Sequence, residues 1–170
     1  LVKKKMNNTP QTRIIKKPGF DDQIDPQKHH HKNLEWYHKN TNPAGTPNYN
    51  AFNQRIHPTT SKILVQHLFD LRTGKNSPKG TKRGPRSPIT ISGTRIRAPS
   101  LFQMMEKHQQ KPLLEFTEDD AIQFFQDMQD GIILSKNGTP YTDPVSYTKL
   151  FIKFWRYNII IKKNQDLTLP

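Results

Sequence analysis

Proline and glycine divide this sequence into short windows, and their spacing limits which regular elements the chain can form. Its 170 residues include 14 Pro and 8 Gly. A proline inside a helix or a central strand removes a backbone hydrogen bond, so regular elements are confined to the windows between prolines. Within those windows apolar residues recur at i, i+3, i+4 and i+7, which is the spacing of an amphipathic helix. The sequence therefore predicts an all-α fold.

The first two predicted helices are bounded by prolines and a glycine. Pro58 suits a first helical turn, and Gly74 suits a left-handed helix end. Residues 75–94 hold so many prolines and glycines that we expect a loop there. The second helix is predicted to begin at Pro99 and to end before Pro112. We therefore expect two helices joined by a long loop.

The third and fourth predicted helices begin at recognisable caps. Thr117 and Asp120 have the spacing of a capping box, and Gly131 marks the end of that helix. The Asp-Pro pair that ends at Pro144 predicts the start of the fourth helix, which runs to about Lys163. The residues on its apolar face are Tyr147, Leu150, Phe151, Phe154 and Trp155. The four helices are expected to pack as one small domain with these side chains in its core.

The residues before the first predicted helix lack a sustained apolar period. They are basic and rich in Pro, Asn and His, a composition typical of disordered segments. Their apolar residues form only a sparse group: Leu34, Trp36, Tyr37, Tyr49, Phe52 and Ile56. We expect residues 1–57 to be a largely disordered tail, residues 58–163 to be the folded domain, and residues 164–170 to be a linker.

Positive charge is concentrated in the middle of the chain. The sequence carries 27 Lys and Arg against 14 Asp and Glu, a net charge of +13, which favours nucleic acid as a partner over a membrane surface. Residues 58–112 alone hold eleven Lys and Arg against two acids, a net charge of +9. The fourth helix adds a basic row at i, i+4 and i+7. The residues expected to contact nucleic acid are Lys75, Lys79, Lys82, Arg83, Arg86, Arg95, Arg97, Lys149, Lys153 and Arg156.

The aromatic residues favour duplex DNA over a single strand. Phe151, Phe154 and Trp155 fall on the predicted buried face, so they are not available as a platform on which bases could stack. Contacts between Lys or Arg and phosphates give a salt-dependent affinity but carry no sequence information. We therefore expect double-stranded DNA as the partner and leave its target sequence open.

Other kinds of site have little support in the sequence. The absence of Cys excludes a disulfide scaffold and a Cys-ligated zinc site. Consecutive residues such as His29–His31 do not easily converge on one ion, even with His38 and His57 nearby. The acids Glu118–Asp120 are explained as helix capping. We expect no metal, no cofactor, no small-molecule substrate and no membrane span, and we expect a cytoplasmic protein.

The second half of the sequence resembles a known family. The run PLLEFTEDDAIQFFQDM, a Lys-Asn-Gly-Thr-Pro-Tyr turn and the run DPVSYTKLFIKFWRY are similar to the amino-terminal core-binding domain of tyrosine recombinases, the phage-type integrases, of the archaeal type. The matching residues are Pro112, Leu113, Thr117, Asp120 and Phe124, then Tyr147, Leu150, Phe151, Phe154 and Trp155. The run LVQHLFDLRTGK resembles the first helix of that domain. The resemblance covers about residues 58–163 and lies mainly at core positions.

The resemblance implies a SAM-like four-helix fold that forms half of a C-shaped clamp on DNA. In that family a following catalytic domain supplies two Arg, a Lys, a His and a nucleophilic Tyr. Only fifteen residues follow Trp155 here, and Tyr157 does not stand in the position of that nucleophile. We therefore expect this chain to bind DNA without cutting it, as the amino-terminal part of a recombinase that integrates or recombines DNA. Other recombinase protomers on the same DNA would be further partners.

Two alternatives use the same basic residues differently. The first is a structural RNA-binding protein of the ribosomal type, in which basic extensions rich in Pro and Gly thread through folded RNA. The second is a catalytically inactive regulator that competes for a recombination site. A preference for duplex DNA over structured RNA would favour a recombinase-like protein over the first alternative.

Overall fold

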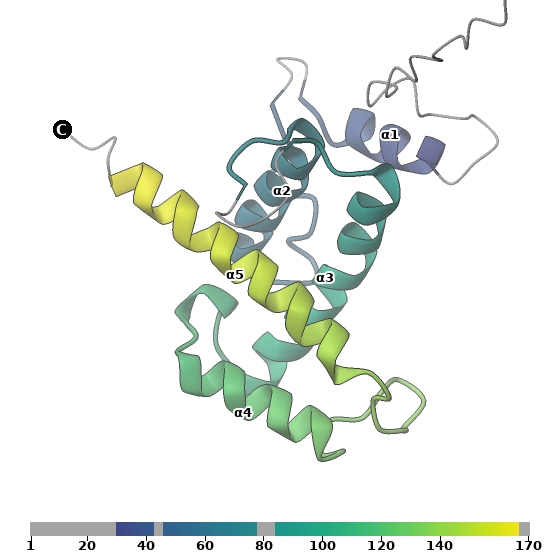
Figure 1. The fold of residues 1–170 in the computed structure, drawn as a ribbon, viewed down its shortest axis with the longest axis vertical. Coiled ribbons are helices and arrows are strands. Elements are labelled where there is room, and N and C mark those ends of the chain that lie inside the picture. The colour runs from purple at the N-terminus through teal and green to yellow at the C-terminus, as the bar shows by residue number, and fades with distance from the viewer. Residues whose placement is uncertain (1–29, 43–45, 78–83, 167–170) are drawn as a thin grey trace, which may run out of the picture.

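The computed structural model describes residues 30–42, 46–77 and 84–166, and the regular elements of these residues are all helical. They are α1 (His30–Lys39), α2 (Pro58–Thr73), α3 (Pro88–Gln109), the short 3-10 helix η2 (Leu113–Glu115), α4 (Glu118–Gln129) and α5 (Pro144–Asp166). Helix α3 packs against each of the other four α-helices, and α5 crosses the bundle between α4 and α2 (Figure 1). The predicted all-α character is confirmed for this part of the chain, with five α-helices in place of the expected four.

Helix α3 begins at Pro88, so the predicted helix start at Pro99 is wrong. The predicted loop over residues 75–94 is wrong from Pro88 onward, whereas residues 75–77 and 84–87 have no regular structure, as expected. Ser87 caps the helix, because its Oγ accepts a hydrogen bond from a backbone N–H of the first turn at 3.4 Å. Pro88 then occupies the first turn, where a missing N–H removes no helical bond. Pro99 lies buried in the middle of the helix, where it has no N–H to donate to the carbonyl of Arg95. The packing of α3 against four helices compensates for that lost bond.

Two predicted boundaries of the folded domain also differ from the structure. Helix α1 packs on α3, and Tyr37, Phe52 and Ile56 are buried in the main core. The described residues before Pro58 are therefore part of the domain, whereas residues 1–29 of the expected tail lie outside the part that the structure describes. At the other end α5 continues to Asp166, so the expected linker begins within a helix. Contacts with distant residues, which local periodicity does not reveal, stabilise the extension before Pro58.

The predicted caps of α4 and α5 are confirmed. The Thr117 Oγ1 accepts a hydrogen bond from the Asp120 N–H at 3.3 Å, and the Thr117 N–H donates to Asp120 Oδ2 at 2.6 Å. The Lys111 ammonium lies 2.5 Å from the same carboxylate. The hydrogen bonds from Lys111 and then from Thr117 lower the pKa of Asp120 to about 2. Before α5, the Asp143 Oδ1 accepts a hydrogen bond from the Ser146 N–H at 3.1 Å.

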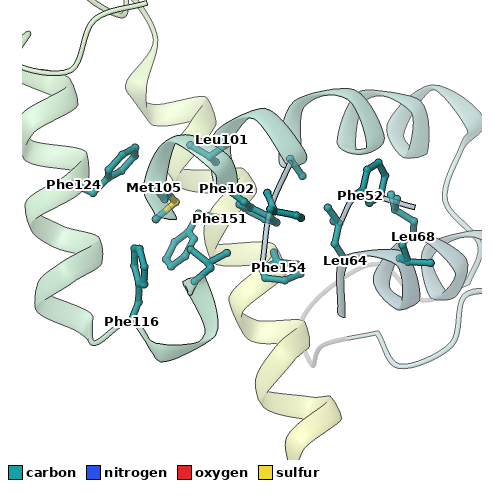
Figure 2. Close-up of a cluster of buried hydrophobic side chains, with 14 of the residues drawn as sticks. Phe52, Leu64, Leu68, Leu101, Phe102, Met105, Phe116, Phe124, Phe151 and Phe154 are labelled. Atoms are coloured by element: carbon teal, nitrogen blue, oxygen red, sulfur yellow. The ribbon is translucent and has the colours of Figure 1, made fainter. Parts of the chain in front are cut away.

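The core is largely aromatic where α3 and α5 meet (Figure 2). Phe154 is 1% exposed, and the centroids of the Phe154 and Phe102 rings lie 4.5 Å apart. Phe151 is also buried and stacks on Trp155 at 5.5 Å. The prediction that Trp155 lies in the core is wrong in part, because its side chain is only partly buried and lines an open groove. Phe154 is therefore the main aromatic anchor of α5.

Gly74 allows the chain to cross closely over the end of α2. Its φ is 77°, in the left-handed region that glycine adopts without strain. A Cβ at this position would lie 2.5 Å from the carbonyl carbon of Gly84, and the Arg86 N–H donates to the carbonyl of Leu71 at 2.8 Å. This crossing brings Lys75 and Arg86, from the two ends of the connecting loop, to the same end of α2.

Replacing Gly74 tests this crossing. Gly74→Ala is expected to lower the free energy of unfolding by about 2–3 kcal/mol, because it combines left-handed strain with a backbone clash. Gly138→Ala is the matched control, since Gly138 has a φ of 72° but no atom within 4 Å of a built Cβ. The control should cost only about 1 kcal/mol. Urea unfolding of both variants measures the difference, and equal losses would contradict a close approach of Gly74 to Gly84.

Replacing two neighbouring aromatics tests which one anchors α5. Phe154→Ala is expected to lower the free energy of unfolding by about 3–5 kcal/mol, because it leaves a cavity in the core. Trp155→Ala should cost about 1–2 kcal/mol, since the indole is only partly buried. Thermal unfolding followed by circular dichroism compares the two. A larger loss for Trp155→Ala would show that the two side chains have been assigned the wrong roles.

Candidate nucleic-acid interface

One cleft collects positive side chains from three separate segments. It lies between the end of α2, the first half of α3 and the first half of α5, and its volume is about 740 Å³. Among the described residues, the Lys, Arg, Asp and Glu side chains that line it are six cations and one acid: Lys75, Arg86, Arg97, Lys149, Lys153, Arg156 and Asp70. All six cations are among the residues that the sequence predicts to contact nucleic acid. We call this feature the basic cleft.

Helix α5 supplies half of these cations from one face. Lys149, Lys153 and Arg156 stand at i, i+4 and i+7 and are exposed. Phe151 and Phe154 extend into the core from the other side of the helix and are 6% and 1% exposed. A helix divided in this way can contact a polyanion while its packed face stays unchanged.

Arg97 ties the α3 wall of the basic cleft to α5. Its Nη2 donates a hydrogen bond to the Ser146 Oγ at 2.6 Å, and its guanidinium carbon lies 5.1 Å from the centroid of the Tyr147 ring. Ser146 belongs to the first turn of α5, so these contacts fix where the two helices meet. Arg97 is exposed and has further N–H donors in its guanidinium group, so it can contact a phosphate as well.

A buried carboxylate joins the walls of the basic cleft at its floor. Asp70, on α2, is 4% exposed. Its Oδ2 accepts hydrogen bonds from the Tyr157 hydroxyl at 2.6 Å and from Asn76 Nδ2 at 2.7 Å. Its Oδ1 accepts a hydrogen bond from Gln66 Nε2 at 3.0 Å. These donors satisfy a charge that would otherwise be costly to bury, and they connect α2 to α5 and to the segment that follows α2.

The two ring side chains of the floor do not add charge to the basic cleft. Burial and the hydrogen bond to Asp70 raise the pKa of the Tyr157 hydroxyl, so this group keeps its proton and donates a hydrogen bond to the carboxylate. The His67 ring lies 4.4 Å from that of Tyr157. Burial lowers the pKa of His67 to about 4, and the nearby Asp70 offsets this only in part. At neutral pH the positive potential therefore comes from Lys and Arg.

Arg95 does not join the other cations. Its guanidinium carbon lies 5.5 Å from the centroid of the Trp36 ring, and its Nε is buried without a hydrogen-bond partner. Arg95 therefore holds α1 on α3 through a cation–π contact, because the helix turns it away from the face that carries Arg97. The expected open loop is therefore wrong for Arg95, which belongs to α3 and does not line the basic cleft. Three further predicted residues, Lys79, Lys82 and Arg83, lie outside the described part of the chain.

The uncharged residues of the α3 wall were missed by the sequence analysis. Ile89, Thr90, Gly93 and Thr94 all line the basic cleft. They recur at the spacing of one helix face, counted from Pro88. A predicted helix start at Pro88 would place these four residues on one helix face. The expected loop assigns them no common face.

A second hollow, between α4 and α5, has the opposite character. Its volume is about 730 Å³, and Glu118 is the one charged residue that lines it within the described part of the chain. Its exposed apolar side chains are Ile122, Val145 and Ile152. We call it the apolar groove. The two hollows show that α5 presents a charged face and an apolar face to its surroundings.

Two further features are absent from the residues that the structure describes. Within residues 30–42, 46–77 and 84–166, no three His, Asp or Glu side chains gather in a way that could hold a metal ion. Over the same ranges, no helix is both long enough and apolar enough to cross a membrane.

Acid is expected to destabilise the domain through His67. The unfolded chain takes up a proton on this residue with a pKa near 6.5, whereas the folded chain resists protonation until about pH 4. The contribution of neutral His67 to the free energy of unfolding should therefore be fully present above about pH 6.5. It should be lost as the pH falls toward 4. His67→Gln, which has no imidazole to protonate, should lose less free energy of unfolding between pH 7 and pH 4.5 than the wild-type protein. Equal losses in urea unfolding would contradict a buried, neutral His67.

The chain matches no family model, no curated protein and no solved structure in the comparisons with known proteins. We therefore infer a function from the residues of the basic cleft themselves.

Proposed function

We propose that this chain binds the phosphate backbone of double-stranded DNA in the basic cleft. The observation that supports this most strongly is the convergence of six Lys and Arg side chains on one cleft, against a single buried carboxylate among the described residues. Three of these cations come from α5, Arg97 comes from α3, and Lys75 and Arg86 come from the segment between α2 and α3. The acceptor atoms of that carboxylate are already occupied by neutral donors. Cations that neutralise phosphates release condensed counterions, and this release dominates affinity for DNA.

The lining of the basic cleft favours a duplex over a single strand. Proteins that bind single strands without sequence preference stack successive bases on exposed aromatic rings. Of the Phe, Tyr and Trp residues that the structure describes, Tyr157 alone lines the basic cleft, and it is 1% exposed. The cleft thus offers cations for phosphates and no platform for unpaired bases.

We further propose that this binding serves a recombinase-like clamp. The resemblance to core-binding domains implies a helical domain that presses on DNA, and the described residues form an all-α domain. The basic row of α5 supplies cations that such a clamp would need. The Tyr157 hydroxyl is buried against Asp70, so the proposed role is to hold DNA while another domain acts on it. A structural RNA-binding protein would use the same cations. A preference for structured RNA over duplex DNA would distinguish that role from this proposal.

Charge reversal within the basic cleft is the main test. Replacing Lys149, Lys153 and Arg156 together by Glu is expected to weaken binding to duplex DNA about a hundredfold or more at moderate salt. The thermal midpoint should change little, because these side chains are exposed. The matched control replaces three exposed lysines outside the cleft by Glu, namely Lys39, Lys107 and Lys136. Equal losses in the two triple variants would show that net charge, and not the cleft, determines binding.

The salt dependence of binding gives a second readout of the same proposal. Six phosphate contacts predict that log K falls with log salt with a slope of about −5, and the reversed variant should have a shallower slope. Binding to duplex DNA and to structured RNA of equal length should be compared over this salt series. A clear preference for the duplex supports the proposal. A preference for RNA supports the ribosomal-type alternative, and binding to neither overturns both.

A further inference from the structure

The α3 wall of the basic cleft carries a strip without charge. Ile89 and Gly93 stand at i and i+4 on α3 and line the cleft, followed by Arg97 at i+8. Thr90 and Thr94 lie beside them on the same face. Of the five α3 residues that line the cleft, Arg97 alone is charged. The first two turns of α3 therefore present an uncharged surface to any molecule held by the surrounding cations.

Gly93 has no evident folding role at its position. It lies in the interior of a helix of 22 residues, where glycine is less favourable than alanine because more backbone freedom is lost on folding. A Cβ built on Gly93 meets no atom within 4 Å, so close packing does not require glycine here. What a missing side chain does allow is the close approach of another molecule to the helix.

Ile89 is exposed in a cleft that is otherwise rich in charge. Its side chain is 68% exposed, one helical turn before Gly93. An aliphatic side chain gains nothing from a phosphate, but it gains free energy from burial against sugars, base edges or the thymine methyl group. Ile89 and Gly93 therefore suit the part of a nucleic acid that lies between its phosphates.

We propose that the strip of Ile89 and Gly93 contacts the sugars and bases of DNA while the cations of the basic cleft hold its phosphates. This inference rests on the proposed DNA binding and assigns a second kind of contact to the same site. The cations determine the affinity and its salt dependence. The strip makes the cleft select a nucleic acid over a polyanion that consists of phosphate alone.

Gly93→Leu tests the strip, because its effects on folding and on binding should have opposite signs. Leucine is a better helix former than glycine, and its Cβ has open space, so the thermal midpoint should stay constant or rise. Binding to a duplex of about two helical turns should weaken about tenfold or more, because the new side chain fills the space that the DNA would occupy. Binding to inorganic polyphosphate should change by less than about threefold. Gly93→Ala should raise the midpoint with a smaller loss of DNA binding.

Ile89→Ala tests the apolar contact separately. It is expected to weaken duplex binding by about fivefold to tenfold, because apolar contact area is lost, and to leave the salt slope unchanged. Ile96→Ala is the matched control, since Ile96 lies on the same helix, is 58% exposed and does not line the basic cleft. The control should bind duplex DNA as the wild-type protein does.

The outcomes separate this inference from the proposed function. If Gly93→Leu and Ile89→Ala bind duplex DNA normally while the charge reversal on α5 abolishes binding, the inference about the strip is wrong and DNA binding stands. If the α5 reversal leaves binding intact, the proposed function itself fails. Equal losses for duplex DNA and polyphosphate would show that the variants disturb the cations, and would also overturn the role of the strip.

Discussion

The hydrogen bonds that converge on the Asp70 carboxylate hold the basic cleft together. They join α2 to α5 through Tyr157 at 2.6 Å and to the segment after α2 through Asn76 at 2.7 Å. The walls that carry Lys75 and the basic row of α5 thus meet at one buried anion. A buried carboxylate without partners is costly, so losing either donor would loosen a wall as well as remove one contact. The same negative charge lies beneath six cations and reduces their mutual repulsion. The geometry of the site therefore depends on an acid that is itself buried.

Three consecutive residues of α5 lie in three different environments. Ile152 lines the apolar groove, Lys153 lines the basic cleft and Phe154 fills the core. Successive residues on an α-helix are about 100° apart, so three in a row divide the circumference among three neighbours. A shift of one residue in the register of α5 would place a cation in the core and an aromatic ring in the cleft. The contacts that fix where α5 begins, above all the hydrogen bond from Arg97 to Ser146, therefore position the core and the site together.

Local signals in the sequence predicted the elements whose ends are determined locally. A proline in the first turn and a capping box located α2, α4 and α5, and helical spacing placed the α5 cations on one face.

Features that depend on distant contacts were not predictable in this way. Helix α1 is stabilised by the burial of Tyr37, whose hydroxyl donates to the carbonyl of Leu68, and nothing near Tyr37 in the sequence indicates that contact. Periodicity also could not decide which edge of the α5 stripe is covered, so Trp155 was expected in the core beside Phe154. The error at α3 came from reading Pro99 as a helix start when tertiary packing tolerates it inside the helix.

The features of the basic cleft that are least favourable for folding occur together. Six cations repel one another across one cleft, Gly93 weakens the helix it belongs to, and Ile89 exposes an aliphatic side chain to water. None of these features strengthens the core on the other side of α5, where Phe154 and its neighbours are closely packed. A polyanion with apolar surface between its charges would compensate for all three, because it would screen the cations, occupy the space at Gly93 and cover Ile89. A ligand that binds only the folded state also raises the free energy of unfolding. DNA bound in the basic cleft would therefore offset the stability that these three features cost the free protein. Several locally destabilising features in one cleft are typical of a binding site.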